Sequence, residues 1–419
     1  MSKEVVNKDE LHESLSLEKQ QELLEKFDLE SNQRNPQNFM KHVVYFGLLA
    51  FTLYQLYTAI FGQFPAQIQR TVHLGFALVF IFLLFPATRK LSKARIPFYD
   101  YILALVAVFV GSYWVLNYER LVQSLGKLET LDFYVGLLAI VLVLEAARRA
   151  VGLPIAIIAA VFLLYAFFGP YMPAFMSHRG QGLESIVNLM YFSTDGILGT
   201  PLAVSATFIF VFLLFGAFLV KTGVGQYFND LAISVAGKLT GGPAKVAIFS
   251  SALQGTISGS SVANVVTSGS YTIPMMKRLG YNKNFAGAVE ASASTGGQLM
   301  PPIMGAAAFL MVEFIGRGIT YWDIAKAAAI PALLYFTGIW IMTHFEAKRI
   351  GLRGLTDEEM PDRKHVFKKI YLLIPIVLII VLMVSGVPVV HAALYGIISC
   401  VVVGLINPDV RFGVKEFID

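Results

Sequence analysis

The stretch that decides the fold reads GGPAKVAIFSSALQGTISGSSVANVVTSGSYTIPMMKRLGY, residues 241–281, and is soon followed by FAGAVEASASTGGQLMPP, residues 285–302. Both segments are moderately apolar but crowded with glycine, serine and threonine. Pro243 suits the first turn of a helix, and Gly255 and Gly259 permit tight backbone near the SGSS sequence at 258–261. We therefore expect two short helices, at 243–257 and 262–277, that join at a polar tip.

The rest of the chain consists largely of long apolar runs. Of 419 residues, 56% are hydrophobic and 15% charged, whereas a soluble domain is typically about 45–50% apolar and about 25% charged. Runs of roughly 17–22 residues are long enough to cross a bilayer. This composition excludes a soluble enzyme, a nucleic-acid binder and a secreted disulfide scaffold. It predicts an all-α polytopic membrane protein with about ten spans: 42–62, 71–87, 99–117, 131–150, 153–170, 201–220, 285–313, 322–345, 369–386 and 389–406.

The basic residues predict how the chain is oriented. They concentrate in alternate connections, at 89–95, 148–149, 277–283, 348–369 and 411–415. Positively charged loops stay in the cytoplasm, so we place these connections and the N-terminus there. Residues 1–41 are polar and contain no apolar core for a signal peptidase, so we expect an uncleaved cytoplasmic segment.

The same charges constrain the segment 241–278. The preceding span ends inside at Lys221, and Lys277 and Arg278 must again lie inside, so this segment enters and leaves the membrane on one face. We predict a re-entrant helical hairpin, whose irregular tip needs protein or a water-filled cavity around it. Its hydroxyl and amide oxygens suit a monovalent cation. Close helix packing uses the same small residues and is the alternative that composition alone favours.

A second interruption lies within the span 285–313. Gly296 and Gly297 loosen this helix, and Pro301 and Pro302 remove backbone donors, so we predict an unwound break near the mid-plane. A re-entrant tip followed by a broken helix is typical of the ion and substrate sites of secondary transporters.

Glu290 and Gln298 are the polar side chains predicted to lie deepest along this span. An intramembrane carboxylate is a candidate proton or cation relay, but Glu290 is near enough to the basic end of the helix to reach water instead. Both interpretations remain open at this point. Tyr113 and Trp114 lie near the end of a span and fit an interfacial aromatic belt.

The sequence shows none of the catalytic motifs that we considered. HExxH and GxxxxGK[ST] motifs are both lacking, and no histidine lies near Ser258 or Ser268 to act as the base of an intramembrane protease. Cys400 is the only cysteine and cannot form an internal disulfide. We therefore expect no enzyme activity and no cofactor.

Several ordered motifs mark a family resemblance. SGSSVANVVTSGSYTIPMMKRLGY (258–281), FAGAVEASASTGGQLMPP (285–302) and DGILGTPLAVSATFIFVFLLFGAFL (195–219) resemble the large membrane subunit of tripartite ATP-independent periplasmic (TRAP) transporters. The preceding region, 42–150, is similar to the small four-helix subunit, fused in front as in permeases that accompany a TAXI-type binding protein. Residues 151–419 would then form the large-subunit-like permease domain, with the hairpin at 241–278 and the broken helix at 285–313.

The resemblance implies an elevator-type importer in the bacterial inner membrane. It would be driven by sodium and would receive organic acids from a periplasmic substrate-binding protein, without nucleic acid or cofactor. The family's first sodium site maps onto Ser258, Gly259, Ser260, Ser261, Ser294, Thr295 and Gly296. The candidate substrate-site residues are Asn264, Gln298, Pro301 and Pro302, and Asn264 stands where relatives often carry Asp.

The resemblance also raises the question of the second repeat. The family carries a second, inverted copy of the hairpin and the broken helix, whereas this sequence shows one of each. We expect that a second repeat, from a separate chain if necessary, is needed for uptake. The alternatives are a non-transporting scaffold or assembly subunit, or a truncated inactive permease. An ion channel is less favoured because a pore needs several symmetry-related filters.

Overall fold

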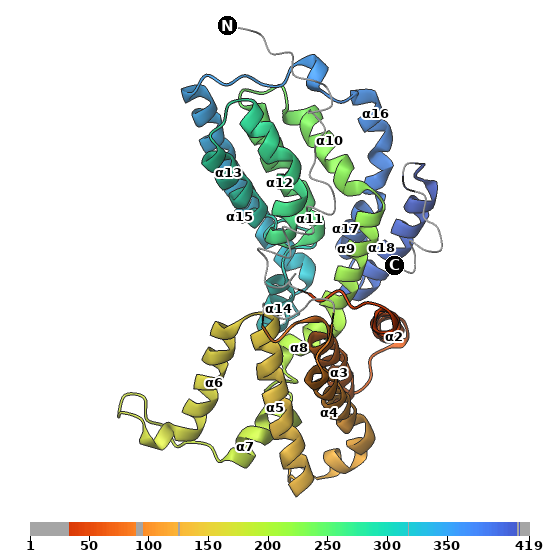
Figure 1. Ribbon diagram of the computed structural model, residues 1–419. Helices are drawn as coiled ribbons and strands as arrows, with labels where there is room; N and C mark the ends of the chain where they lie inside the picture. Colours follow the sequence, from red (N-terminus) through yellow and green to blue (C-terminus); the bar gives the residue numbers. More distant parts are fainter. Residues whose placement is uncertain (1–32, 89–94, 125, 317, 409, 411–419) are drawn as a thin grey trace. The chain divides into compact units, whose positions relative to one another are not determined.

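The computed structural model describes residues 33–88, 95–124, 126–316, 318–408 and 410, and within these ranges the chain is helical without a strand (Figure 1). The predicted all-α class is confirmed. Most of the predicted cytoplasmic segment 1–41, together with the basic residues at 89–94 and 411–415, lies outside the described residues. Among the described residues, nine helices are long and apolar enough to cross a membrane, and they match nine of the ten predicted spans.

These nine candidate spans have the following bounds. Six of them are single helices: Phe39–Phe61 (α2), Ala66–Leu84 (α3), Phe98–Gln123 (α4), Thr130–Ala150 (α5), Tyr321–Arg349 (α15) and Val389–Ile406 (α18). The other three are composite. Leu153–Phe168 (α6) has a short extension to Tyr171, Thr200–Lys221 consists of Thr200–Val204 (α8), a π-helical turn at Ser205–Ile209 and Phe210–Lys221 (α9), and Asp357–Val384 includes Arg363–Lys368 (α16) and Ile374–Val384 (α17). The tenth predicted span is divided into two short helices, Lys283–Gly296 (α13) and Ala306–Ile315 (α14).

The chain forms two compact units. Among the described residues, the first unit lies within Glu25–Thr207 and the second within Phe208–Asp419. The first unit therefore extends past residue 150 and includes α6, a short helix at Leu183–Val187 (α7) and α8. We predicted a domain boundary at residue 150 from the family resemblance. The two compact units are a different kind of division, so this boundary stays a prediction.

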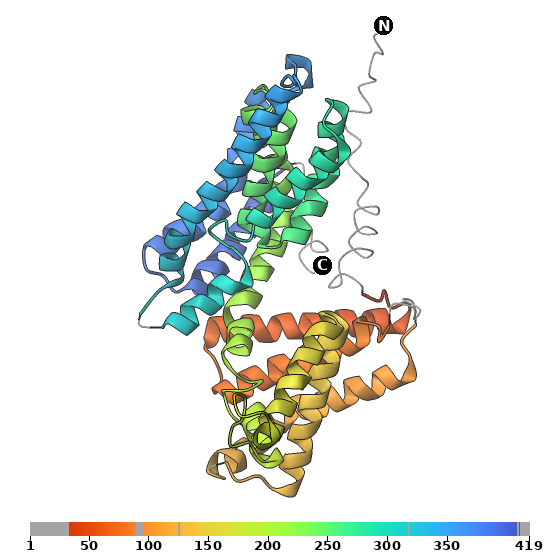
Figure 2. The same cartoon turned by 90° about the vertical axis from the view of Figure 1, so that its left-hand side faces the viewer.

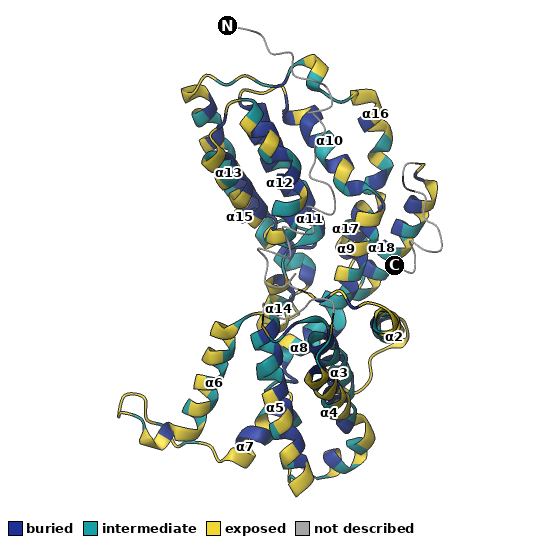
Figure 3. Cartoon of the chain, viewed as in Figure 1, coloured by how far each residue is buried: buried dark blue, intermediate teal, exposed yellow. Residues whose placement is uncertain are grey.

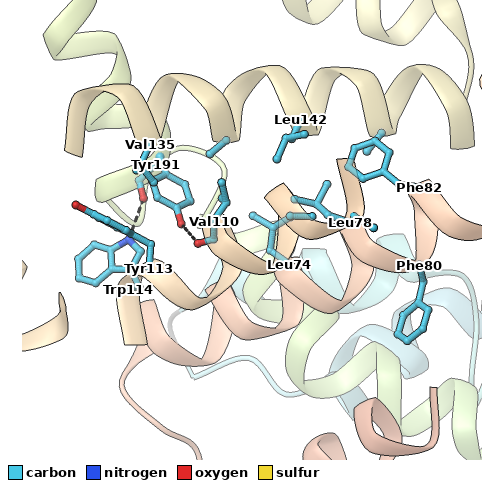
Figure 4. Packing of buried hydrophobic residues seen from close by; sticks show 14 of the residues in the cluster. Leu74, Leu78, Phe80, Phe82, Val110, Tyr113, Trp114, Val135, Leu142 and Tyr191 are labelled. Atoms are coloured by element: carbon cyan, nitrogen blue, oxygen red, sulfur yellow. Dashed lines mark hydrogen bonds between the residues drawn. The ribbon is translucent and has the colours of Figure 1, made fainter. Parts of the chain in front are cut away.

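The core of the first unit forms where α3, α4 and α5 pack against one another. Gly75 and Gly111 allow a close crossing, since a Cβ built on Gly111 would lie 2.6 Å from the Cα of Gly75. Figure 4 shows Tyr191 inserted into this core, where its hydroxyl donates to the carbonyl oxygen of Val110 (2.6 Å) and its own carbonyl accepts from Trp114 Nε1 (3.3 Å). Small and aromatic residues thus fix the packing of these helices.

The aromatic-belt interpretation of Tyr113 and Trp114 is wrong. Both side chains are buried, and the hydroxyl of Tyr113 donates to Asp132 Oδ1 (2.5 Å). Their position near the end of a span suggested the membrane interface, but α4 extends to Gln123 and turns this face towards the core.

The first unit contains a buried network of ion pairs around Asp100. Asp100 Oδ2 lies 2.6 Å from an Arg34 nitrogen, and Asp100 Oδ1 lies 2.7 Å from an Arg149 nitrogen. Arg149 also pairs with Glu145 (2.7 Å) and lies over the ring of Phe82. A single buried carboxylate therefore holds two buried guanidinium groups.

The second unit contains the segments that decided the fold. The hairpin consists of Gly242–Ser258 (α11) and Ser261–Arg278 (α12), which confirms the two predicted helices to within a residue or so at each end. An amphipathic helix, Val224–Ala236 (α10), precedes it. At the base of the hairpin the Tyr281 hydroxyl donates to the carbonyl oxygen of Gly241 (3.3 Å), so the two ends lie together.

Helices α11, α12, α13 and α15 lie side by side in both views (Figures 1 and 2). Figure 3 shows how burial differs among the helices, because α6 is largely exposed whereas α11 is buried along most of its length. Exposed apolar side chains on α6 suit a helix that faces lipid. A helix that carries many small and polar residues, such as α11, instead needs protein around it. Helices α10, α12, α13 and α15 pack against α11 and cover it.

Candidate functional site

The hairpin tip and the broken helix meet backbone to backbone in the second unit. A Cβ built on Gly255 would lie 2.3 Å from Gly297 Cα, and one on Gly259 would lie 2.1 Å from the carbonyl oxygen of Met304. Gly259 also has a positive φ of 57°, which ends α11. Glycine is therefore required at both contacts, and the two interruptions that the sequence predicted form one structure.

Asn264 lies at this junction and has an unpaired oxygen. Its Nδ2 donates to the carbonyl oxygen of Ser251 (2.9 Å), which fixes the orientation of the amide. The side chain is fully buried, and among the described residues its Oδ1 has no hydrogen-bond partner. A Cβ on Gly297 would lie 2.8 Å from Asn264 Nδ2, so the amide packs directly on the break. A buried carbonyl oxygen without a partner is costly, and it is a ready ligand for a cation.

The predicted tip residues surround the turn between α11 and α12. Ser258, Gly259, Ser260 and Ser261 are all partly buried. The hydroxyl of Ser260 caps α12 by accepting from Ala263 N (3.3 Å), and the hydroxyl of Ser261 accepts from Gln298 Nε2 (3.2 Å). The tip is thereby connected to the break. Gln298 itself is exposed, and its predicted depth along the membrane span stays a prediction.

The predicted residues of the break point in different directions. Ser294 is buried, whereas Thr295 is exposed and its hydroxyl donates back to the carbonyl oxygen of Ala291 (2.8 Å). Gly296 packs on the ring of Tyr335, where a Cβ would lie 2.6 Å from a ring carbon. Between α13 and α14 the chain is non-helical, as predicted. This connection, 297–305, contains Pro301 and Pro302.

Glu290 lies in a cage of hydroxyl groups from three helices. Its side chain is 0% exposed, so Glu290 does not reach water in this structure, and its role as a proton or cation relay stays a prediction. Oε1 accepts from Ser251 on α11 (3.1 Å), from Ser294 on α13 (3.1 Å) and from Ser268 on α12, while Oε2 accepts from Thr272 on α12. The carboxyl group therefore joins the hairpin to α13.

Sequence reasoning missed three members of this cage, namely Ser251, Ser268 and Thr272. The signal was present, because Asn264, Ser268 and Thr272 follow one another at intervals of four residues and so share one face of a helix. That face points at α13 in the structure. Ser268 entered the sequence reasoning only as a protease nucleophile, a role for which it has no neighbouring base.

A second polar chain lies on the other side of α11. Asn229 on α10 accepts from Ser250 and from Gln254 Nε2 (2.9 Å), and Gln254 Oε1 accepts from Thr267 on α12 (2.7 Å). At the base of the hairpin Lys245 is buried, with its Nζ 3.0 Å from His344 Nδ1 on α15. These contacts fix α11 in the bundle at both ends.

The chemistry of this region is that of neutral oxygen ligands. Within the ranges that the structure describes, no group of three His, Cys, Asp or Glu residues could hold a metal ion. The tip, Asn264 and the break instead offer hydroxyl, amide and backbone oxygens. Such ligands suit a hard monovalent cation better than a transition metal.

Two discontinuous helices that meet inside a bundle of apolar spans define a secondary-transporter type of membrane protein. The comparisons identify the family. The sequence pattern described as "Tripartite ATP-independent periplasmic transporter, DctM component" matches residues 138–418. The chain belongs to this family of transport permeases, which are transporters rather than enzymes.

Curated relatives carry the same assignment. The chain is similar to a C4-dicarboxylate TRAP transporter large permease protein, DctM, of Pseudomonas aeruginosa, with 29% identity over 177 residues, or 40% of each chain. A sialic acid TRAP transporter large permease protein, SiaM, of Vibrio cholerae is 28% identical over 40% of this chain and 39% of its own. An isethionate TRAP transporter permease protein, DctMQ, of Oleidesulfovibrio alaskensis is 27% identical over 40% of this chain and 26% of its own. The matches span about two fifths or less of each of these relatives.

Proposed function

We propose that this chain is the permease component of a sodium-driven, binding-protein-dependent transporter that imports organic acids across the bacterial inner membrane. The observation that carries the proposal is the buried, unpaired Oδ1 of Asn264 at the junction of the hairpin tip and the broken helix. A sodium ion there would satisfy this oxygen together with hydroxyl and backbone oxygens of the tip and the break. The proposed ligands are those named from the sequence: Ser258, Gly259, Ser260, Ser261, Ser294, Thr295 and Gly296, with Asn264 added.

The substrate class and the partner rest on the relatives. Their printed names give C4-dicarboxylates, sialic acid and isethionate, which are all organic acids. Transporters named as tripartite and periplasmic imply a periplasmic substrate-binding protein as a partner. We infer the same class of substrate and the same kind of partner for this chain. Near the tip, Gln298, Pro301 and Pro302 remain the proposed substrate contacts, whereas Asn264, which the sequence named with them, is proposed as a sodium ligand because its amide nitrogen is already bonded to Ser251.

The region before the matched residues supports a fused small subunit. The family pattern starts at residue 138, within α5, whereas α2, α3 and α4 precede it. These helices pack with α5 around a single core. We propose that residues 42–150 serve as the small four-helix subunit of a fused permease of the TAXI-associated type.

Sodium is expected to stabilise the chain against heat more than potassium does. A ligand present at about 100 times its Kd adds about 2.7 kcal/mol to the free energy of unfolding. We expect the difference in Tm between NaCl and KCl to disappear in Asn264→Ala and to decrease in Ser260→Ala and Ser261→Ala. Thermal unfolding of the purified chain in detergent, followed by circular dichroism in each salt, measures this difference.

The matched control is Ser385→Ala, at the end of α17, where the serine hydroxyl donates only to the carbonyl oxygen of Val381 (2.8 Å). It should keep the full sodium effect. Because each variant is compared with itself in the two salts, a general loss of stability cannot imitate the result. An equal sodium effect in the wild type and in all three site variants would favour the packing interpretation of the tip.

Topology gives a second expected result. If the basic connections are cytoplasmic, Asn284 at the base of the hairpin lies inside, and Glu313 near the end of α14 lies outside. Both side chains are exposed. On a Cys400→Ser background, a membrane-impermeant maleimide should label Glu313→Cys in intact spheroplasts, but Asn284→Cys only after permeabilisation. Labelling of Asn284→Cys in intact spheroplasts would contradict the predicted orientation.

A further inference from the structure

The two most exposed large hydrophobic side chains among the described residues lie in one loop of the first unit. They are Tyr171, which is 85% exposed, and Phe175, which is 86% exposed. The loop, residues 170–178, follows the C-terminal end of α6 and precedes α7, and this connection is mostly exposed (Figure 3). Its other apolar residues add to the same surface, and a contiguous exposed apolar surface marks a place where something else binds.

This loop is folded back on the end of α6. The hydroxyl of Tyr165 donates to the carbonyl oxygen of Met176 (2.7 Å), and the backbone N–H of Gln181 donates to the carbonyl oxygen of Ala166 (2.9 Å). The ring of His178 packs edge-on against that of Tyr165, with Nε2 3.0 Å from the carbonyl oxygen of Tyr165. The exposure of the aromatic rings therefore belongs to a loop that its own contacts hold in place.

Much of the backbone of this loop is satisfied without water. Pro170 and Pro173 have no N–H group to satisfy. Within 170–181, five N–H groups donate inside the protein: Met172 and His178 to the carbonyl oxygen of Gly169, Met176 to that of Pro173, Gln181 to that of Ala166, and Gly180 to Nδ1 of His178. Backbone groups without partners are excluded from the hydrocarbon of a bilayer, so a loop with few free donors can lie closer to it than an ordinary loop.

The loop continues a surface that suits lipid. Helix α6 has no buried residue, and residues 151–178 contain no Asp, Glu, Lys or Arg. The 16 residues of α6 rise about 24 Å, which is less than the roughly 30 Å of a hydrocarbon core. The short extension to Tyr171 completes the crossing. The loop therefore begins where the hydrocarbon ends and the head groups start.

We propose that the loop 170–178 is a membrane anchor, which inserts Tyr171 and Phe175 among the lipids at the interface next to the end of α6. Aromatic rings are enriched at this depth, and tyrosine combines an apolar ring with a hydroxyl group that reaches water. A soluble protein partner fits this surface less well, because the loop offers no carboxylate, lysine or arginine to orient a partner. The anchor is independent of the proposed sodium site and of the substrate.

Spin labelling of the full chain in lipid nanodiscs tests the depth of the loop. On a Cys400→Ser background, a nitroxide is attached to Phe175→Cys or to Tyr171→Cys, where the native side chain is so exposed that its replacement removes little packing. Power saturation then compares collisions with oxygen, which concentrates in lipid, and with a water-soluble nickel chelate. We expect oxygen to dominate at both positions, as at Phe162→Cys on α6. The matched control is Arg353→Cys, in the exposed polar connection between α15 and α16, where the nickel chelate should dominate.

Two outcomes would overturn the proposal. If the nickel chelate dominates at both loop positions, the loop lies in water and its aromatic rings are free for a soluble partner. If both reagents collide rarely at these positions but normally at the two reference positions, the rings are covered by protein, such as a second copy of the chain. Because the measurement needs neither sodium nor substrate, a failed uptake experiment would count against the proposed function and leave the anchor intact.

Discussion

Replacing Asp100 by Asn is expected to lower the free energy of unfolding of the first unit by about 3–5 kcal/mol. The carboxylate lies between Arg34 and Arg149, and all three side chains are almost completely buried. Asparagine has nearly the same shape, so the packing is kept while the only buried negative charge of the network is removed. Arg34 then lacks its counterion, and Arg149 keeps only the partly exposed Glu145 (2.7 Å), so a buried charge is left uncompensated, which is the costly way to break a buried ion pair.

The measurement can be confined to the first unit. Trp114 is the only one of the three tryptophans that lies there, and it is buried in the core. With Trp322 and Trp340 replaced by Phe, the fluorescence of Trp114 during denaturation in mixed micelles reports this unit alone. Asp100→Asn should shift the midpoint of this transition strongly towards lower denaturant.

The matched control is another exchange of an acid for its amide. Glu129 is exposed and pairs with Arg120 (3.1 Å), and exposed pairs are typically worth about 0–1 kcal/mol. Glu129→Gln should therefore shift the same transition only slightly. Equal shifts in the two variants would mean that the network of Asp100 is solvated and contributes no more than a surface pair.

The sequence was sufficient to predict where the chain interrupts its helices. Glycine and proline act through local backbone geometry, so their positions predicted the hairpin at 241–278 and the break before residue 306 with small errors. Apolar run length likewise predicted the spans, because bilayer thickness sets the length of a helix. The π-helical turns at Asn188–Phe192 and Ser205–Ile209 have no comparable local signal and were not predicted.

The directions of side chains could not be predicted in the same way. Helices covered by other helices carry small polar residues on several faces, so composition does not tell which face meets a neighbour. Glu290 could therefore be placed along α13 but not assigned to a cage with Ser251, Ser268 and Thr272. The same limitation explains the error at Tyr113 and Trp114, where the neighbouring helix rather than the position along the span decides burial.

The close approach of the tip and the break predicts a large difference between two Gly→Ala substitutions. Alanine is favoured over glycine in a helix interior by about 1 kcal/mol. At Gly287 on α13 no atom lies within 4 Å of the new Cβ, so Gly287→Ala should be neutral or slightly stabilising. At Gly255 on α11 the Cβ would lie 2.3 Å from Gly297 Cα, and backbone atoms cannot rotate away. Overpacking of this kind typically costs about 1–3 kcal/mol, and occasionally more.

The two substitutions should also differ in their response to sodium. If the ion binds where the tip and the break meet, Gly255→Ala forces the two backbones apart and should abolish the Tm difference between NaCl and KCl. Gly287→Ala lies on the same helix as the break but away from the contact, so it should retain the wild-type difference. A Gly255→Ala chain that melts like Gly287→Ala and still responds fully to sodium would show that the ion does not depend on the junction. The unpaired oxygen of Asn264, which is buried beside the junction, would then need another explanation.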